Sequence, residues 1–314
     1  MKIFDRLESI QQPFVNAVIT IGNFDGVHIG HQALFHEVIE KAEAIEGTSI
    51  AMTFEPHPMR VLKQNNHPPL ITLYEQKKEL IERSGIDVLI CVPFTKKFAA
   101  LSAEAFIKDL LIEKIGMKAI IVGQDYTFGR NREGNLALLK SYAARMGYDV
   151  IVAEWIKTAR NVADRISSTR VRKLVMNGEI ETARKMLGRH YQIRGLVVKG
   201  RDRGGKLLGT PTANINLQDE LCPKTGIYAV TVEYRQRLYR GVANIGYSPT
   251  FNDNEFTVEV HLLDFDENIY DRKIRVNFIA RIRDEKKFDG IDELKSQIHQ
   301  DIEDGRKILA TYAE

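Results

Sequence analysis

Two histidines flank a glycine where an apolar run gives way to a helical pattern, in the segment IGNFDGVHIGHQALF (residues 21–35). A helix that begins there presents backbone N–H groups and the positive end of its dipole, which favour a phosphate. Two imidazoles at this point are expected to neutralise charge on an α-phosphoryl group in its transition state. The predicted catalytic residues are His28 and His31, and the predicted phosphate-contacting residues are Asn23, Phe24, Asp25, Gly26 and Gly30.

A second polar stretch, ISSTRVR (166–172), gathers hydroxyl groups and an arginine at the start of another helical pattern. By itself such a stretch is more often an ordinary helix N-cap. Paired with the two histidines, it predicts a second phosphate clamp, because hydroxyls and a guanidinium bind anions well. The residues assigned to this clamp are Ser168, Thr169 and Arg170.

Two further loops follow predicted strands. TFEPHP (53–58) ends one strand and VGQDYTFGRNREG (122–134) ends another. Each alone is typical of a plain loop, but together they offer apolar walls and cations suited to a flat aromatic ligand that carries phosphate. The residues predicted to contact such a ligand are Phe54, Pro56, His57, Asp125, Phe128 and Arg130.

The second half of the chain contains a near match to a phosphate loop, GRDRGGKL (200–207). Leu207 replaces the magnesium-binding hydroxyl, and the residues that follow do not form a helical pattern, so a true P-loop is not expected. Just after it, Thr212 and Asn214 are two positions apart on an extended segment, so their side chains point the same way. Both offer the hard oxygens that Mg²⁺ prefers. Glu259 stands inside the otherwise apolar FTVEVHLL, where a buried carboxylate could take a proton from a hydroxyl. Its alternative is a solvent-facing position on a half-exposed strand.

The surrounding pattern predicts two domains, 1–187 and 188–314. In the first, unbroken apolar strands alternate with amphipathic helices, which indicates a doubly wound parallel sheet of the α/β class. One of these helices is expected to open with a capping box between Thr72 and Glu75. In the second, the period changes to two, which favours an antiparallel β-barrel with one C-terminal helix over 291–310.

Bulk composition narrows the function classes. Lys and Arg number 45 against 42 Asp and Glu, so no strong field directs the chain to nucleic acid. No apolar run approaches the ~20 residues of a membrane span, and charges within the first ten residues argue against a signal peptide. Cys91 and Cys222 are far apart and predict neither a disulfide framework nor a zinc site. A cytoplasmic enzyme is expected.

The letters His-Ile-Gly-His also occur in a class of aminoacyl-tRNA synthetases, but the Lys-Met-Ser-Lys-Ser loop of that class is absent here. The longer string resembles the nucleotidylyltransferase superfamily. With GKLLGTPTANI, VANIG, VEVHLLDF and IRDEKKF added, the whole chain resembles the bacterial bifunctional riboflavin kinase/FMN adenylyltransferases, also called FAD synthetases.

This resemblance implies two ATP- and magnesium-dependent reactions. The barrel is expected to phosphorylate riboflavin to FMN, with Thr212 and Asn214 holding Mg·ATP and Glu259 as the base. The first domain is expected to adenylylate FMN to FAD with release of pyrophosphate. The barrel residues assigned to ATP phosphates are Gly200, Lys206 and Gly209. The resemblance also implies that the flat ligand of TFEPHP and VGQDYTFGRNREG is the flavin. Thr210 and Asp271 depart from the pattern of many members, and some members carry Asn where Asp125 stands, although Asp also occurs there. These differences bear on flavin affinity rather than on reaction type.

Two alternatives remain open from the sequence. The barrel could bind flavin without kinase activity, which leaves an FMN adenylyltransferase alone. It could also be a nucleic-acid module, since Lys199, Arg201, Arg203 and Lys206 cluster on one loop. The second is disfavoured because its strands lack the aromatic stacking pattern that single-stranded binding needs. The expected partners are therefore ATP, riboflavin, FMN and FAD, without nucleic acid or membrane, and the oligomeric state is not predicted.

Overall fold

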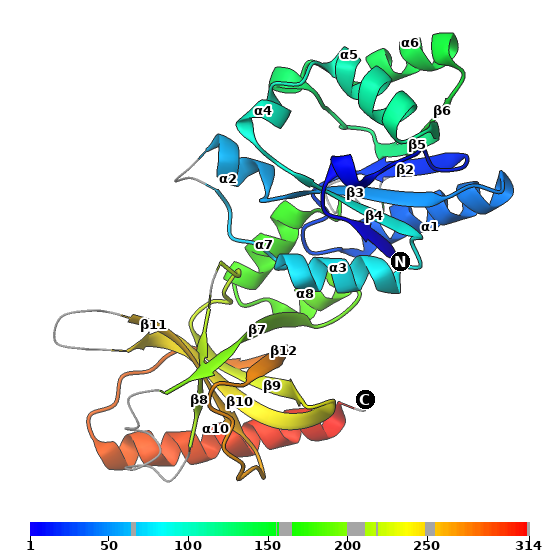
Figure 1. The fold of residues 1–314 in the computed structure, drawn as a ribbon. Helices are drawn as coiled ribbons and strands as arrows, with labels where there is room; N and C mark the ends of the chain where they lie inside the picture. Colours follow the sequence, from blue (N-terminus) through cyan, green and yellow to red (C-terminus); the bar gives the residue numbers. More distant parts are fainter. Residues whose placement is uncertain are drawn as a thin grey trace. The chain divides into compact units, whose positions relative to one another are not determined.

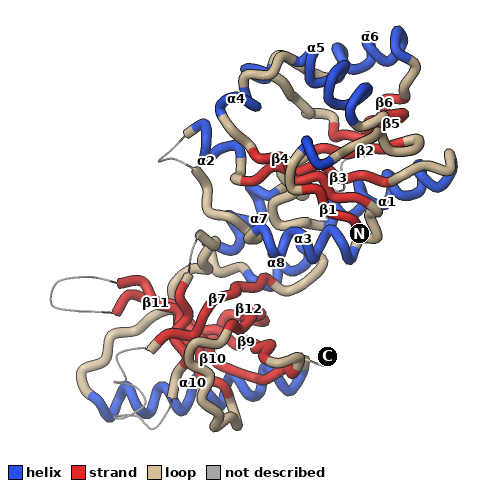
Figure 2. The backbone as a smooth tube through the Cα atoms, viewed as in Figure 1, coloured by secondary structure: helices blue, strands red, loops and turns tan. Residues whose placement is uncertain are grey.

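The computed structural model describes residues 1–63, 67–154, 156, 165–199, 211–217, 219–248 and 255–312. Contacts between Cα atoms divide the chain into two compact units, Met1–Ser168 and Thr169–Glu314. Each unit has its own sheet, a six-stranded open sheet in the first and a closed barrel in the second. The two units are visible in Figures 1 and 2, and each is described by itself.

The sheet of the first unit is parallel throughout, with the strand order β1-β4-β3-β2-β5-β6. Every residue of β2 is buried, as expected for a strand that is covered on both faces. The doubly wound parallel sheet predicted from the sequence is confirmed. Its strands are β1 (Lys2–Phe4), β2 (Ala17–Ile21), β3 (Ser49–Glu55), β4 (Val88–Pro93), β5 (Met117–Gly123) and β6 (Asp149–Ala153).

Helices cover both faces of this sheet (Figure 1). One face packs against α1 (Ile29–Ala44) and α3 (Tyr74–Arg83), through a core that includes Phe35, Val38 and Ile81. The other packs against α5 (Ala103–Ala105), the π-helix η2 (Phe106–Lys114) and α6 (Leu136–Met146). The short helices are η1 (Leu7–Ser9), α2 (Pro58–Leu62), α4 (Lys96–Ala99) and η3 (Arg130–Arg132).

The strand order reverses between β2 and β5. After β2 the chain builds β3 and then β4 on one side, whereas β5 and β6 lie on the other. Loops that leave the carboxyl ends of β2 and β5 therefore diverge to opposite faces and leave a crevice between them. In open α/β sheets this switch point is where ligands bind.

The start of α3 differs from the prediction. Its N-cap is Leu73, and no side chain caps it. The Thr72 hydroxyl instead donates to the Asp25 carboxylate over 3.3 Å and accepts the N–H of Gly26 over 3.0 Å. The predicted capping box between Thr72 and Glu75 is wrong, because partners far away in sequence take the hydroxyl.

The second unit is a closed six-stranded barrel in the order β10-β11-β8-β7-β12-β9, with antiparallel pairing throughout. The antiparallel barrel with a C-terminal helix is confirmed. Its strands are β7 (Tyr191–Val198), β8 (Ala213–Asn216), β9 (Gly226–Tyr234), β10 (Arg237–Ser248), β11 (Glu255–Leu262) and β12 (Lys273–Arg283).

Helix α10 (Ile291–Thr311) packs along the barrel, with Leu309 buried against Ala229 and Ile279 (Figure 1). Its approach to β10 depends on Gly305, where a Cβ atom would lie 2.6 Å from the Val242 side chain. A close approach of this kind holds the helix and the barrel wall at a fixed spacing.

Helices α7 (Ser168–Met176) and α8 (Ile180–Leu187) precede the barrel. The compact units divide at Ser168, whereas the sequence placed the boundary at Gly188. The difference has a physical cause: α8 packs against β7 and β12, and Gly178 between the helices lies against the Arg281 side chain. Helix α8 therefore packs on the barrel, and the turn that joins it to α7 lies against the barrel as well.

Candidate active sites

The two histidines of the first candidate site stack on each other. His28 is the N-cap of α1, and its Nδ1 atom accepts the N–H of His31 over 3.3 Å. The rings are 3.6 Å apart between centroids and 17° from parallel. Because Nδ1 acts as an acceptor, the proton of a neutral His28 ring lies on Nε2. Gly30 makes room for this ring, since a Cβ atom there would lie 3.2 Å from it.

Both histidines line a cavity of about 270 Å³ at the carboxyl ends of β2, β5 and β6. This is the switch point of the sheet, so the predicted motif and the expected ligand crevice coincide. The predicted residues that the cavity brings together are Phe24, His28, Gly30, His31, Asp125 and Ser168. Further lining residues include Gly22, Gly123, Glu154, Arg165 and Ser167.

An ion pair and a hydrogen bond connect parts of this cavity that are distant in sequence. Arg165 lies 2.8 Å from the Asp125 carboxylate, which joins the segment before α7 to the loop after β5. The Ser168 hydroxyl donates to the backbone carbonyl of Asp25 over 2.8 Å. Segment 165–168 is thereby attached to both loops, and its hydroxyl groups border the same space as the histidines.

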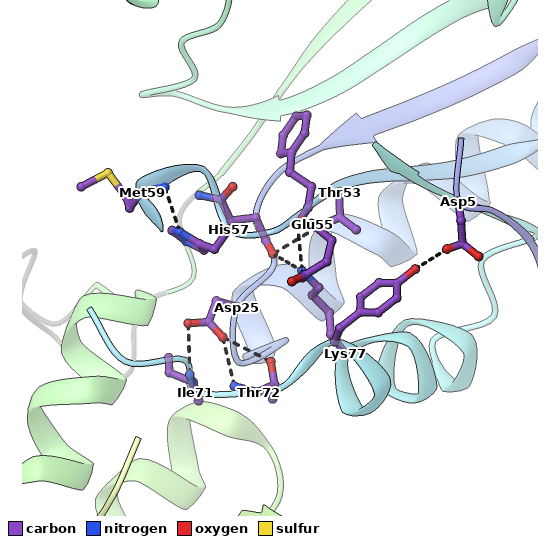
Figure 3. Close-up of polar contacts among 12 residues, drawn as sticks. Asp5, Asp25, Thr53, Glu55, His57, Met59, Ile71, Thr72 and Lys77 are labelled. Carbon is purple, nitrogen blue, oxygen red and sulfur yellow. Dashed lines mark hydrogen bonds and ion pairs between the residues drawn. The ribbon is translucent and has the colours of Figure 1, made fainter. Parts of the chain in front are cut away.

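Asp25 lies behind the loop rather than in the cavity. Its carboxylate is 3% exposed and accepts the N–H groups of Ile71 and Thr72 over 3.1 and 3.0 Å (Figure 3). The loop it anchors is strained, because Phe24 and Val27 have positive φ angles of 47° and 38°. Asp25 was predicted to contact phosphate, and in this structure its carboxylate holds the loop in place.

Asn23 and Gly26 were also predicted to contact phosphate, and neither is among the residues that line the cavity. The Asn23 side chain is exposed, while its backbone carbonyl accepts the Thr53 hydroxyl over 3.2 Å. Gly26 is buried, and its N–H donates to Thr72. With φ at +85°, Gly26 occupies a conformation that favours glycine.

Two of the residues predicted to contact flavin, Phe54 and Phe128, belong to one aromatic cluster. Ring contacts run from Phe54 through Phe98 and Phe106 to Phe128, with centroid separations of 5.9, 6.4 and 5.4 Å. The cluster links the ends of β3 and β5. Neither ring lines the histidine cavity, so Asp125 is separated from the aromatic pair with which the sequence grouped it.

The remaining predicted flavin contacts are dispersed. His57 is buried and caps α2, with its Nδ1 atom accepting the N–H of Met59 over 3.2 Å (Figure 3). Pro56 is exposed next to it, after a cis peptide bond from Glu55. Arg130 is exposed in η3, 3.7 Å from the Glu133 carboxylate. The structure thus brings Pro56 and His57 together and does not group Arg130 with them.

The second candidate site is assembled by strand register in the barrel. Glu259 on β11 is the direct cross-strand partner of Asn214 on β8 and of Asn244 on β10. Side chains directly opposite each other in a ladder point to the same face of the sheet. Thr212 hydrogen-bonds the Glu259 carboxylate, so the three residues predicted for this site gather as expected, together with Asn244.

A cavity of about 220 Å³ between the barrel and α10 borders Thr212, Asn244 and Glu259, whereas Asn214 is not among its lining residues. Its lining is partly apolar, with Phe288, Leu294 and Ile298, and partly polar, with His261, Arg283, Glu285, Lys286 and Asp301 beside the first three. His261 is held by a 2.8 Å hydrogen bond between Nδ1 and the carbonyl of Pro211. A polar group at one end of an apolar slot suits a flat ligand with a hydroxylated tail.

Burial raises the pKa of Glu259 above its ordinary value, and the hydrogen bond from Thr212 opposes that rise. A carboxylate with a raised pKa is a stronger base than an exposed one. Glu259 is half-buried at the cavity, whereas its neighbours Val258 and Val260 are fully buried.

Of the other residues predicted to contact phosphate, those that the structure describes are not among the residues that line either cavity. Gly200, Lys206 and Gly209 lie outside the described residues. Thr169 and Arg170 form the first turn of α7 within the second unit, where Thr169 is exposed and Arg170 half-buried. The residues that the structure describes contain no group of three His, Cys, Asp or Glu side chains placed to hold a metal ion.

Known proteins match the chain in two consecutive parts. A family model described as FAD synthetase matches residues 10–170, and one described as riboflavin kinase matches residues 187–309. The chain belongs to the bifunctional riboflavin kinase/FMN adenylyltransferase family. The resemblance inferred from the sequence motifs is confirmed, and so are the two enzyme domains, a nucleotidyltransferase followed by a kinase.

Relatives named bifunctional riboflavin kinase/FMN adenylyltransferase match nearly end to end. That of Buchnera aphidicola subsp. Schizaphis graminum is 37% identical over 306 residues, covering 96% of this chain and 97% of its own length. That of Escherichia coli strain K12 is 38% identical over 303 residues, covering 96% of each chain. A solved structure from Streptococcus pneumoniae, described as a macrolide-efflux protein, is 32% identical with a TM-score of 0.86 over 99% of both chains. Among the described residues, no helix has the length and apolar character needed to traverse a bilayer.

Sequence reasoning missed two sets of residues in the riboflavin kinase domain. Asn244 was visible as the one polar side chain in GVANIG, but only the register places it opposite Glu259. Arg283 and Asp301 form a two-armed ion pair of 2.7 and 2.6 Å between β12 and α10, at the border of the same cavity. They are 18 residues apart, and no local spacing signals the pair.

Proposed function

We propose that the stacked histidines of the FAD synthetase domain serve FMN adenylylation and that Glu259 of the riboflavin kinase domain serves riboflavin phosphorylation, each with ATP as the second substrate. The observation that carries the proposal is the pairing of Glu259 with Asn214 by strand register, together with the hydrogen bond between Thr212 and Glu259, which both line a cavity. The division of these activities near Gly188 is supported by the riboflavin kinase match, which begins at residue 187.

In the barrel, Glu259 would accept the proton of the terminal ribityl hydroxyl while that oxygen attacks the γ-phosphorus of ATP, and the bond from that phosphorus to the leaving ADP would break. The raised pKa of Glu259 supports this role, because the carboxylate gains basicity from burial. Phosphoryl transfer otherwise needs alignment and charge neutralisation. The apolar slot formed with α10 would hold the isoalloxazine ring and direct the ribityl chain towards Glu259.

Thr212 and Asn214 would hold Mg²⁺ together with the ATP phosphates. A hydroxyl and an amide oxygen are hard ligands that fit Mg²⁺, which supplies charge neutralisation at the phosphates when bound. The Thr212 hydroxyl bonds Glu259 in the structure, so it would change partner or bridge both groups. Asn244, on the same face, would position the Glu259 carboxylate.

In the FAD synthetase domain, an oxygen of the FMN phosphate would attack the α-phosphorus of ATP, and the bond to pyrophosphate would break. His28 would donate a hydrogen bond from Nε2 to the α-phosphoryl oxygens as negative charge builds on them. Its N-cap position and the stacked His31 ring fix the direction of that donor. Ser168 and Arg165 would bind the outer phosphates, and the cluster around Phe54 and Phe128 would hold the flavin.

Chromatography of flavins tests both activities in one preparation. The protein is incubated with ATP and Mg²⁺ and with either riboflavin or FMN, and products are resolved over time. FAD from both flavins is the expected result. FAD from FMN with none from riboflavin would leave the alternative of an adenylyltransferase with an inactive barrel. No FAD from either flavin would refute the proposal.

A further inference from the structure

A lysine that no motif singled out lies buried between the two substrate loops of the FAD synthetase domain. The Lys77 side chain on α3 is only 6% exposed. Its Nζ atom lies 3.4 Å from the backbone carbonyl of Asn23 and 3.5 Å from that of Phe54 (Figure 3). Asn23 follows β2 in the loop that leads to the histidines, and Phe54 stands at the end of β3 in the loop assigned to flavin.

Stability alone does not account for a lysine at this place. Burial disfavours the ammonium form and lowers the pKa of Lys77, and the nearest carboxylate, that of Glu55, is as far as 4.0 Å away. An apolar side chain of similar length would fill the same space without the cost of desolvating a charge. The Nζ atom approaches the carbonyls of Asn23 and Phe54 and the carboxylate of Glu55. These contacts indicate that Lys77 positions the two segments that carry these groups.

The two carbonyls that Lys77 contacts lie just past the pairing of β2 with β3, in which the Gly22 N–H donates to the Met52 carbonyl over 3.1 Å. Beyond that hydrogen bond, side chains join the two segments. The strained part of the histidine loop is anchored through Asp25 to residues 71–72, which immediately precede α3. The Thr53 hydroxyl gives the Asn23 carbonyl one further donor, over 3.2 Å. Among the hydrogen bonds of the described residues, those of Lys77 are the ones that join Asn23 and Phe54 through a single cation.

We propose that Lys77 is a positioning residue for FMN adenylylation, whose ammonium fixes the distance between the ATP loop at Asn23 and the flavin loop at Phe54. This inference rests on the proposed function of the domain. The attacking phosphate oxygen and the α-phosphorus must approach to about 3–3.5 Å, and a displacement of 1 Å can cost about 100-fold in rate. Each substrate keeps its own loop when the ammonium is removed, so binding is affected less than turnover.

The test is Lys77→Met in the full chain, a change that keeps the length of the side chain and removes the charge and donors. With FMN and ATP, kcat for FAD formation is expected to fall about 10- to 100-fold, while KM for each substrate changes less than about 3-fold. Riboflavin kinase activity of the same preparation should be unchanged, which reports that the barrel is folded, and the near-unchanged KM values report that the first unit is folded. Lys78→Met is the matched control, because Lys78 is the adjacent lysine and pairs with Glu75 on the surface side of α3.

Two further variants keep the idea testable if Lys77→Met folds poorly. Lys77→Arg retains a cation with donors and should recover at least a tenth of the wild-type kcat. Thr53→Val removes the other side-chain donor to Asn23 and should lower kcat by about 2- to 5-fold without changing KM.

The possible results separate the inference from the function beneath it. Wild-type kcat in Lys77→Met, equal kcat in Lys77→Met and Lys77→Arg, or a loss that appears only in KM would each overturn the positioning role. Failure of the wild-type protein to convert FMN to FAD would instead refute the proposed function. Loss of kcat with KM and kinase activity preserved supports both.

Discussion

The two candidate sites are built in opposite ways. At the rim of the sheet, the histidines come from one contiguous stretch whose backbone carries positive φ angles at Phe24 and Val27. That stretch is held in place by Asp25 and Thr72, whose polar groups are buried behind it. In the barrel, strand register brings together Asn214, Asn244 and Glu259 from three neighbouring strands. Thr212, just before β8, joins them through a hydrogen bond to Glu259.

This difference indicates which substitutions should lower activity most at each site. A strained loop keeps its shape only while the surrounding contacts over-determine it, so residues that never touch substrate control its geometry. A register-built site inherits its geometry from the ladder hydrogen bonds of the barrel, which no single side chain controls. Anchoring residues should therefore matter more at the rim of the sheet, and substrate-contacting residues should dominate in the barrel.

The largest effect is expected from Glu259→Gln, which keeps the shape of the side chain and removes the base. Formation of FMN from riboflavin should fall about 10²- to 10⁴-fold, the range for loss of a general base. Conversion of FMN to FAD should stay within about 2-fold of wild type, because it takes place in the other domain. Chromatography of both reactions measures this, with the surface variant Glu267→Gln as the control. Parallel loss of both activities in a folded protein would contradict the assignment of separate sites.

A double change, His28→Ala with His31→Ala, should produce the reverse pattern. Loss of preorganised donors to the α-phosphoryl group is expected to lower FAD formation about 10²- to 10³-fold. Supplied with riboflavin, this variant should accumulate FMN. The control is His36→Ala on the same helix, because the His36 side chain is 72% exposed. A variant that still converts FMN to FAD at the wild-type rate would remove the histidines from the mechanism.

Asp25→Asn tests whether the strained loop depends on its anchor. An amide has one acceptor oxygen where the carboxylate has two, and its NH₂ group cannot accept the N–H of Ile71 or Thr72, so at least one hydrogen bond is lost, at a cost of about 1–3 kcal/mol. Hydrogen exchange of those two amides should accelerate, and kcat for FAD formation should fall by about 10-fold while kinase activity is retained. Asp109→Asn, an exposed change in η2, serves as the control. Unaltered exchange would show that the loop does not depend on the carboxylate.

The smallest effect concerns pH and the barrel. Glu259 must be ionised to accept a proton, so kinase activity is lost as pH falls through its pKa, which burial raises above 4.5. The acidic limb of kcat/KM should therefore lie at a higher pH than for an exposed glutamate. Thr212→Val removes the hydrogen bond that lowers this pKa and should move the limb further upward, whereas Thr212→Ser should leave it in place. A limb that moves to lower pH in Thr212→Val would contradict the assignment of Glu259 as the base.

The sequence predicted the helices and strands of both domains well, because the apolar residues of each domain recur with a period typical of its elements. Unbroken apolar strands such as β2 and alternating strands such as β11 show their burial directly in the order of residues. The three-residue edge strand β1 was missed, because so short a segment has no period to detect. The start of α3 was misread because Thr72 and Glu75 have the spacing of a capping box while the hydroxyl finds buried partners at Asp25 and Gly26.

The sequence by itself determined which chemistry the chain carries. His28, Gly30 and His31 form a motif of adjacent residues, and their spacing along a helix start fixes their geometry. Tertiary structure alone decided that Asp25 faces inward, that Lys77 joins two loops and that Asn244 meets Glu259. The physical reason is the range of the forces involved. A helix start is set by hydrogen bonds within one turn, whereas a strand register and a buried charge depend on groups tens of residues away.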